Sequence, residues 1–270
     1  MAKHPSPRET FEFDLNGFCV LRNFFPESRV DQMDQVIEKS PIGKKVHKFL
    51  FITLDDLFLK ILTDSRILKI CEEWIGPHFR FDHAWGLQHF PGDGDPHQNL
   101  HGGPYAEQGF AQYHWFPGKP ICTCLIFGIP LAAQLPGQGG AVFIPGSHKS
   151  NSDMDGWTMY CDILEEKIEG VSWVVEPELL VGDLLVFTDS IMHGTKPWKA
   201  LNRHRRMLYL KYSNGAMGWM AQDDEESVYL RSKAKTPLEK NLFRTAHVSL
   251  SSGNELQLRP KTVSKKRLFG

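Results

Sequence analysis

The sequence has no long hydrophobic segment and no excess of charge of either sign. Its longest apolar stretch, residues 121–133, is broken by Thr123, Gly128 and Pro130 and is too short to span a bilayer. The 31 lysines and arginines are matched by 32 aspartates and glutamates, so the net charge is −1. A nearly neutral chain has no general electrostatic attraction to nucleic acid or to an anionic membrane. We therefore expect neither of these among its partners.

Targeting signals and a cysteine framework are also lacking. No apolar signal region follows Met1, and the chain ends in neither a peroxisomal tripeptide nor a lipidation motif. The five cysteines are scattered and odd in number, which is typical of buried free thiols in a reducing compartment. Cys122 and Cys124 lack a second pair at zinc-site spacing, so we expect no zinc site. These absences favour a cytoplasmic protein.

Hydrophobic residues make up 41% of the chain, which is enough for a sizeable core and excludes disorder as its main state. No internal repeat and no Ser- or Pro-rich linker divides the sequence, so we expect one domain over residues 1–270. The periodicity of the apolar residues changes at about residue 76. We expect a helical part at about 1–76, a β core at about 77–215 and a C-terminal extension at about 216–270.

The pattern of apolar residues predicts a mainly β fold with helices in its N-terminal part. Apolar residues three and four apart predict helices over about 26–40, 54–62 and 65–74, and residues 17–21 predict a short strand. Short apolar runs between Gly, Pro and Asp predict six further strands, at 79–90, 121–129, 140–144, 173–175, 184–188 and 207–212. Because no helices alternate with these runs, they favour an antiparallel sandwich or barrel over a parallel α/β sheet.

Two segments carry residues suited to chemistry: Asn-Leu-His-Gly-Gly-Pro at 99–104 and Asp-Ser-Ile-Met-His-Gly-Thr at 189–195. The strand expected over 184–188 places His193 just past its end, where the mouth of a barrel would lie. Arg205 follows twelve residues later, at the start of the next expected strand. Imidazole binds Fe(II) and other divalent ions, and the planar guanidinium grips a carboxylate through two parallel bonds. The two side chains therefore suit a metal ion together with a carboxylate-bearing ligand.

These residues also have ordinary structural interpretations. His101 is equally typical of a turn in a Gly-rich loop, and Arg205 of a surface ion pair, because two further arginines neighbour it. We interpret His148, in the turn Pro-Gly-Ser-His-Lys, as a turn-stabilising group. The aromatic-rich segment 104–120 is long for a loop, and we interpret it as a substrate lid or a packed flap. The residues that could either line a pocket or pack in the core are Gln88, His114 and Trp115.

Several stretches together resemble the phytanoyl-CoA dioxygenase family of iron- and 2-oxoglutarate-dependent oxygenases. The matching stretches are 16–25, 100–104, 139–149, 182–198 and 205–209, so the resemblance covers about residues 10–215. The turn at 145–149 is specific in combination with the spaced His193 and Arg205. The resemblance implies a double-stranded β-helix, that is, a cupin-like jelly roll with helices packed outside.

The resemblance also implies a site. The family holds Fe(II) with a His-x-Asp pair and a distal His, and binds 2-oxoglutarate with an Arg. His101 matches the first ligand, His193 the distal ligand and Arg205 the co-substrate arginine, while Thr195 matches a position that adds a hydroxyl to the same carboxylate. Where the family has the Asp ligand, two residues after His101, this chain has Gly103. The implied cofactors are Fe(II), 2-oxoglutarate as co-substrate and dioxygen.

The glycine at position 103 leaves one ligand position and one negative charge to be supplied in another way. A halide could fill the gap, as the Gly or Ala of related iron halogenases suggests, or water could suffice. An acid from elsewhere could also reach in, and the candidates are Asp93, Asp95, Glu107 and Asp189. A different register, with His97 and Asn99 as the pair, is a further alternative; we prefer His101 because His-Gly-Gly-Pro resembles one branch of the family.

The resemblance implies a dioxygenase that hydroxylates an aliphatic C–H bond of a small molecule and converts 2-oxoglutarate to succinate. One alternative is a halogenase, with chloride bound where Gly103 replaces the Asp. A second is a jelly-roll binding protein that has lost catalysis. A weaker third is a non-oxidative metal enzyme in which Arg205 holds a substrate acid. Fold similarity does not name a substrate, and phytanoyl-CoA itself is not implied.

Overall fold

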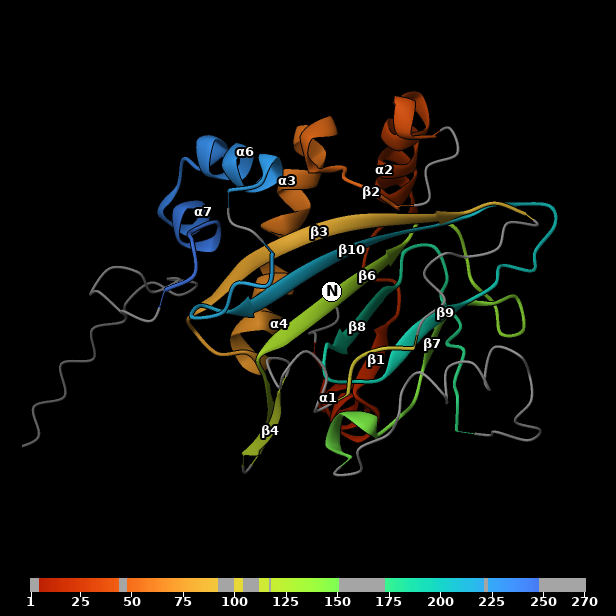
Figure 1. Cartoon of the computed structure of the whole chain (residues 1–270), viewed down its shortest axis with the longest axis horizontal. Helices are drawn as coiled ribbons and strands as arrows, with labels where there is room; N and C mark the ends of the chain where they lie inside the picture. Colours follow the sequence, from red (N-terminus) through yellow and green to blue (C-terminus); the bar gives the residue numbers. More distant parts are fainter. Residues whose placement is uncertain are drawn as a thin grey trace, which may run out of the picture.

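A six-stranded antiparallel sheet forms the centre of the molecule (Figure 1). The computed structural model describes residues 5–43, 48–91, 100–103, 112–116, 118–150, 173–220 and 223–247. The sheet has the order β1-β8-β6-β10-β3-β2. Its strands are β1 (Phe18–Leu21), β2 (Lys48–Phe49), β3 (Phe79–His89), β6 (Cys124–Pro130), β8 (Leu184–Thr188) and β10 (Arg205–Asn214). Strands distant in sequence therefore lie side by side, as in a jelly roll.

A smaller sheet pairs β7 (Gly140–Phe143) with β9 (His193–Lys196) and forms a second layer (Figure 1). The side chains between the two layers form a cluster that includes Ile126, Phe143, Phe187, Met207 and Tyr209. A third pair of strands, β4 (Tyr113–Phe116) and β5 (Lys119–Cys122), makes a hairpin. The mainly β fold with a jelly-roll core is therefore confirmed.

The outer face of the large sheet is covered by helices, and this contact is the main hydrophobic core. The helices are α1 (Pro7–Asn16), α2 (Glu27–Lys39), α3 (Asp56–Leu62), α4 (Ser65–Trp74), α6 (Glu225–Lys233) and α7 (Pro237–Leu242). Short 3-10 turns are η1 (Pro41–Gly43), η2 (Ile52–Leu54) and η4 (Ser147–Lys149). None of the described helices has the length and hydrophobicity needed to cross a membrane.

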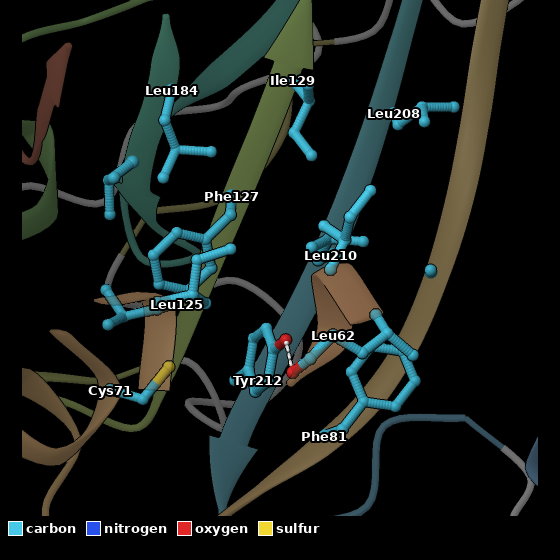
Figure 2. Close-up of a cluster of buried hydrophobic side chains, with 14 of the residues drawn as sticks. Leu62, Cys71, Phe81, Leu125, Phe127, Ile129, Leu184, Leu208, Leu210 and Tyr212 are labelled. Atoms are coloured by element: carbon cyan, nitrogen blue, oxygen red, sulfur yellow. Dashed lines mark hydrogen bonds between the residues drawn. The ribbon is translucent and has the colours of Figure 1, made fainter. Parts of the chain in front are cut away.

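Strand β10 shows how the two faces of the sheet are used, because neighbouring side chains of a strand point to opposite faces. Leu208, Leu210 and Tyr212 point toward the helices, and Figure 2 shows them packed in the outer core. The Tyr212 hydroxyl donates a hydrogen bond of 2.8 Å to the carbonyl of Leu62 in α3 (Figure 2). Met207 and its alternate neighbours on the strand point into the space between the two sheets.

The predicted helices at 26–40 and 65–74 correspond to α2 and α4. In α3, Asp55 is the N-cap and lies outside the first turn; its carboxylate accepts from the Leu57 amide. The strand predicted over 121–129 is two strands, because the chain leaves β5 at Thr123 before it enters β6. The strand predicted at 173–175 is reduced to a single bridge between Val175 and Phe143.

The segment 104–120 was expected to be one long loop. Its described part forms the β4–β5 hairpin instead, and residues 104–111 lie outside the described structure. The hairpin is attached to α1 by a hydrogen bond from the Tyr113 hydroxyl to the carboxylate of Asp14. The four cysteines in the described part of the chain are buried and free, as expected, and Cys161 lies outside it.

Candidate functional site

His101 and His193 lie next to each other across a two-residue β-bridge. The His101 amide donates to the His193 carbonyl at 2.9 Å, and the His193 amide donates back to the His101 carbonyl at 2.8 Å. Their ring centroids are 4.1 Å apart. Backbone pairing thus brings together two histidines from distant segments, and both line the same cavity.

The ring of His193 is held in one tautomer. Its Nδ1 lies 2.8 Å from the carbonyl oxygen of Ile191, which can only accept, so Nδ1 carries the proton. Burial of the ring and, to a smaller extent, the neighbouring His101 lower the pKa of His193 to about 3. His193 is therefore neutral, with Nε2 as its basic nitrogen, and this is the form in which histidine binds a metal ion.

Two glycines follow His101, and both have a backbone that favours glycine: φ is +92° at Gly102 and +95° at Gly103. A Cβ at Gly102 would clash with the carbonyl oxygen of Ile191. A Cβ at Gly103 would meet only the side chain of Met192, at 3.5 Å. The strand alternation that would place position 103 on the face of His101 does not continue past the bridge.

The described residues contain no cluster of three or more His, Cys, Asp or Glu side chains that could hold a metal ion. Of the four acids considered as replacements for a carboxylate ligand, Asp189 lies in the described structure and lines the cavity. Its carboxylate accepts from Lys211 Nζ at 2.8 Å. The remaining candidates lie outside the described residues, and these are Asp93, Asp95, Glu107 and, for the other register, His97 with Asn99.

Arg205 is completely buried on the inner face of the large sheet. Its Nε donates to Oε1 of Gln134 at 3.0 Å, its first terminal nitrogen to Nδ1 of His89 at 3.1 Å, and its second to the Tyr209 hydroxyl at 3.2 Å. None of these partners is a carboxylate, and Arg205 forms no ion pair with any described residue. A buried cation without a counter-ion is costly, so the site favours the arrival of an anion.

The ion-pair interpretation applies to the next residue, Arg206, which points to the opposite face. Arg206 donates to the carboxylates of Asp34 and Glu38 in α2, to the latter at 2.8 Å. Its Nε donates to Gln88 at 2.8 Å, so Gln88 packs on the helix side and not in the cavity. His114 is exposed on the β4–β5 hairpin, and the side chain of Trp115 is outside the described structure.

The cavity between the two sheets has a volume of about 270 Å³. His101, His193 and Thr195 line it on one side, and its other walls are largely aromatic. Gln134 accepts from both Arg205 and the Ala141 amide, and Ala141 is paired with Thr195 across β7 and β9. Arg205 and Thr195 are therefore held at the same corner. Gln134 and Tyr209 position Arg205, but no sequence motif identified them.

His148 has the structural role expected for it. Its Nε2 lies 3.2 Å from the carbonyl oxygen of Asp14 at the end of α1, and its ring packs edge-on against Tyr113. A Cβ at Gly17, whose φ is +83°, would clash with the His148 ring. Burial lowers the pKa of His148 to about 4, so the ring is neutral at this junction.

Comparison with known proteins supports the fold and identifies a family. The sequence model of the phytanoyl-CoA dioxygenase family matches residues 13–207. No curated protein matches the chain. HygX of Streptomyces hygroscopicus, in a crystal structure with nickel and 2-oxoglutarate bound, superposes with a TM-score of 0.68 at 19% sequence identity, covering 80% of this chain and 90% of HygX. HygX with nickel, 2-oxoglutarate and hygromycin B bound gives the same values. An iron-bound form matches at a TM-score of 0.68 and 18% identity, covering 80% and 89%.

Proposed function

The chain belongs to the phytanoyl-CoA dioxygenase family, and from this premise we propose that it is an Fe(II)/2-oxoglutarate-dependent dioxygenase. The proposed reaction hydroxylates an aliphatic C–H bond of a small molecule. With the metal bound, dioxygen supplies one oxygen atom to the substrate and one to 2-oxoglutarate, which becomes succinate and carbon dioxide. The binding of iron or nickel, 2-oxoglutarate and hygromycin B by HygX supports a reaction of this kind on a small molecule.

The residues present fit these groups. The neutral imidazoles of His101 and His193 would hold the iron, with Nε2 of His193 directed by the hydrogen bond that its Nδ1 donates. Arg205 and the hydroxyl of Thr195 would hold the distal carboxylate of 2-oxoglutarate. The aromatic walls of the cavity would exclude water from the reacting C–H bond.

The single observation that carries this proposal is the state of Arg205. A fully buried guanidinium with three uncharged neighbours and no described carboxylate partner is poorly stabilised by the protein alone. Its second terminal nitrogen donates to the hydroxyl of Tyr209, which lines the cavity together with His101 and His193. A dicarboxylate that binds the metal with one end and Arg205 with the other would explain both the histidine pair and the uncompensated charge of Arg205.

The proposal is tested by adding Fe(II) and 2-oxoglutarate to the protein without oxygen and recording the visible iron-to-ketoacid absorption band. We expect the wild-type chain to give the band. Arg205→Gln should lose it at moderate 2-oxoglutarate concentrations, because the anion loses its counter-charge. Arg203→Gln is the matched control and should retain it, since Arg203 bonds to Gln138 at the protein surface. Absence of the band from the wild-type protein would favour the alternative of a binding protein without catalysis.

Gly103 supports a second candidate, a halogenase. Position 103 offers no side chain, and the described residues supply no carboxylate ligand in its place. Chloride bound at the metal would occupy the ligand position that the family's Asp has and would supply the missing negative charge. A band that shifts with chloride or bromide, and a product whose mass includes the halogen, would favour this candidate. A band that ignores halide would favour hydroxylation.

A further inference from the structure

One end of the cavity is not used by the proposed metal and 2-oxoglutarate site. It is formed by His83, Asp189, Lys211 and Trp219, and we call these four residues the polar end. The polar end lies on the inner face of the same sheet as Arg205, because Lys211 is six residues along β10. Six residues of strand extend about 20 Å, so the two groups are far enough apart to bind different molecules.

The charges of the polar end are balanced within the protein. Lys211 Nζ lies 2.8 Å from Asp189 Oδ2, and the two side chains are only 3% and 10% exposed. The ammonium group also lies over the ring of Trp219, 3.4 Å from its centroid. The only other lysine that lines the described cavity is Lys48, which is exposed to solvent. Either an anion or a cation bound here would add an uncompensated charge, so this end favours a neutral ligand.

His83 adds a hydrogen-bond acceptor, and Asp82 is responsible for its orientation. The register of β3 against β10 shifts here: Lys211 pairs with His83 and Tyr212 with Phe81, so Asp82 is the extra residue of a bulge. The Asp82 carboxylate lies 2.7 Å from Nδ1 of His83. It also accepts from Arg80 at 2.6 Å and from the backbone amide of Trp219 at 3.0 Å.

The state of Asp82 fixes the tautomer of His83. Burial raises the pKa of Asp82, but the hydrogen bonds from His83 and the Trp219 amide and the charge of Arg80 lower it to about 2 overall. An ionised carboxylate only accepts, so Nδ1 of His83 is the donor, and in the neutral imidazole Nε2 carries a lone pair. His83 lines the cavity and its side chain is 20% exposed. Its Nε2 is therefore available to accept from a hydroxyl group.

An aromatic wall continues from His83 toward the middle of the cavity. His83 stacks on Trp85 at 5.1 Å between ring centroids, and Trp85 stacks on Tyr209 at 5.2 Å. The two interplanar angles are 27° and 18°, so the three rings form an offset stack that lines the cavity. The apolar atoms of such a stack contact the C–H groups of a ligand ring, while polar groups at its end bond to the hydroxyls of that ring.

We propose that the polar end binds a neutral, polyhydroxylated ring, such as a sugar or a cyclitol, as the substrate of the site. His83 accepts from one hydroxyl, Lys211 and Asp189 donate to and accept from its neighbours, and Trp85 contacts the C–H groups of the ring. Asp82 is a positioning residue that acts through His83 and Trp219. The identification as a substrate depends on the proposed oxygenase function, whereas the binding of the ring depends on the polar end alone.

The test compares three pyranose probes that differ mainly in charge: neutral methyl α-D-glucopyranoside, anionic D-glucuronate and cationic D-glucosamine. Calorimetric titration of the whole chain should show the tightest binding for the neutral probe. His83→Phe keeps the stacking ring but removes the acceptor, and should weaken that binding about tenfold, the effect of one lost hydrogen bond. The same change at exposed His114 is the matched control and should have no effect.

The charge balance can be reversed in both directions. Lys211→Met leaves Asp189 without its partner and should shift the preference toward D-glucosamine. Asp189→Asn leaves Lys211 without its partner and should shift it toward D-glucuronate. If either single variant fails to fold, the double variant removes both charges together and should keep the preference for the neutral probe. A wild-type preference for either charged probe, or no binding of the neutral one, would overturn the proposal.

The same samples separate the two proposals. Anaerobic Fe(II) and 2-oxoglutarate report the oxygenase site through the visible absorption band, and the sugar titration reports the polar end. Selective binding of the neutral probe without the band would support the polar end and contradict the oxygenase function. The band without selective binding would leave the oxygenase function standing and overturn the assignment of the ring-binding end.

Discussion

Gly103 adopts a φ of +95°, which an L-residue tolerates only with strain of about 1–3 kcal/mol. Space is available, because a Cβ there would meet only Met192 at an ordinary 3.5 Å. We therefore predict that Gly103→Asp binds Fe(II) more tightly than Gly103→Ala, which carries the same strain without a carboxylate. Any dependence of the absorption band on chloride should disappear in the Asp variant alone. Equal iron affinity of the two variants would mean that position 103 does not reach the metal.

Gln134 allows a test of the unpaired charge of Arg205 without removing the arginine. Its Oε1 accepts from Arg205 Nε at 3.0 Å and from the Ala141 amide at 2.8 Å. Gln134→Glu preserves these two bonds and supplies a negative charge that competes with the carboxylate of 2-oxoglutarate, but it loses the bonds that Gln134 Nε2 donates to the carbonyls of Ala141 and Pro177. We expect the Kd for 2-oxoglutarate to rise about tenfold or more, and the thermal unfolding temperature to fall, because two buried carbonyls lose their donor. Unchanged affinity would show that this arginine does not bind the co-substrate.

At the scale of elements, the sequence predicted best what local interactions determine. Helix α4 has its expected bounds because an Asp64 cap starts it and apolar residues repeat along one face. Strand β9 was not predicted, since four residues that begin with His193 become a strand only through pairing with β7. The same limit applies to the site. The spacing of His193 and Arg205 is visible in the sequence, whereas the bulge at Asp82 depends on a distant strand.

The contact between α6 and η2 makes a prediction about pH. Glu226 is buried, and its carboxylate accepts from the Ile52 amide at 3.1 Å. Burial raises the pKa of Glu226 from 4.5 to about 7, despite that hydrogen bond. The folded state therefore holds a proton that the unfolded state has released. The free energy of unfolding should fall as pH rises from about 4.5 to 7, by at most about 3 kcal/mol.

Glu226→Gln removes the ionisation and keeps an acceptor for the Ile52 amide. At pH 8 this variant should be more stable than the wild type in urea unfolding, and at pH 4 the two should be similar. Glu225→Gln changes the exposed neighbour and serves as the matched control, with no expected change in slope. A wild-type stability that does not decline between these pH values would contradict the interpretation of this contact.

At the scale of the whole molecule, β10 connects the layer that stabilises the fold with the layer that carries the site. Its side chains on one face pack under the helices, and those on the other line the cavity. Arg205 and Arg206 are adjacent and equally buried, yet they point to opposite faces. Arg206 pairs with two carboxylates of α2, and Arg205 with none among the described residues. Substitutions at these two neighbouring positions should therefore affect different properties. A change at Arg206 should affect the stability of the fold, and a change at Arg205 should affect ligand binding.

We predict opposite effects for the same substitution at the two arginines. Arg206→Gln breaks the ion pairs that join α2 to the sheet, and should lower the free energy of unfolding by about 2 kcal/mol. Arg205→Gln removes a buried cation that lacks a counter-ion, and should leave the stability unchanged or raise it. The second measurement is the unfolding temperature with and without ligand, because a molecule that binds only the folded state raises that temperature. Fe(II) with 2-oxoglutarate should stabilise the wild type and Arg206→Gln but not Arg205→Gln. Stabilisation of the Arg205 variant by 2-oxoglutarate would contradict the role proposed for this residue.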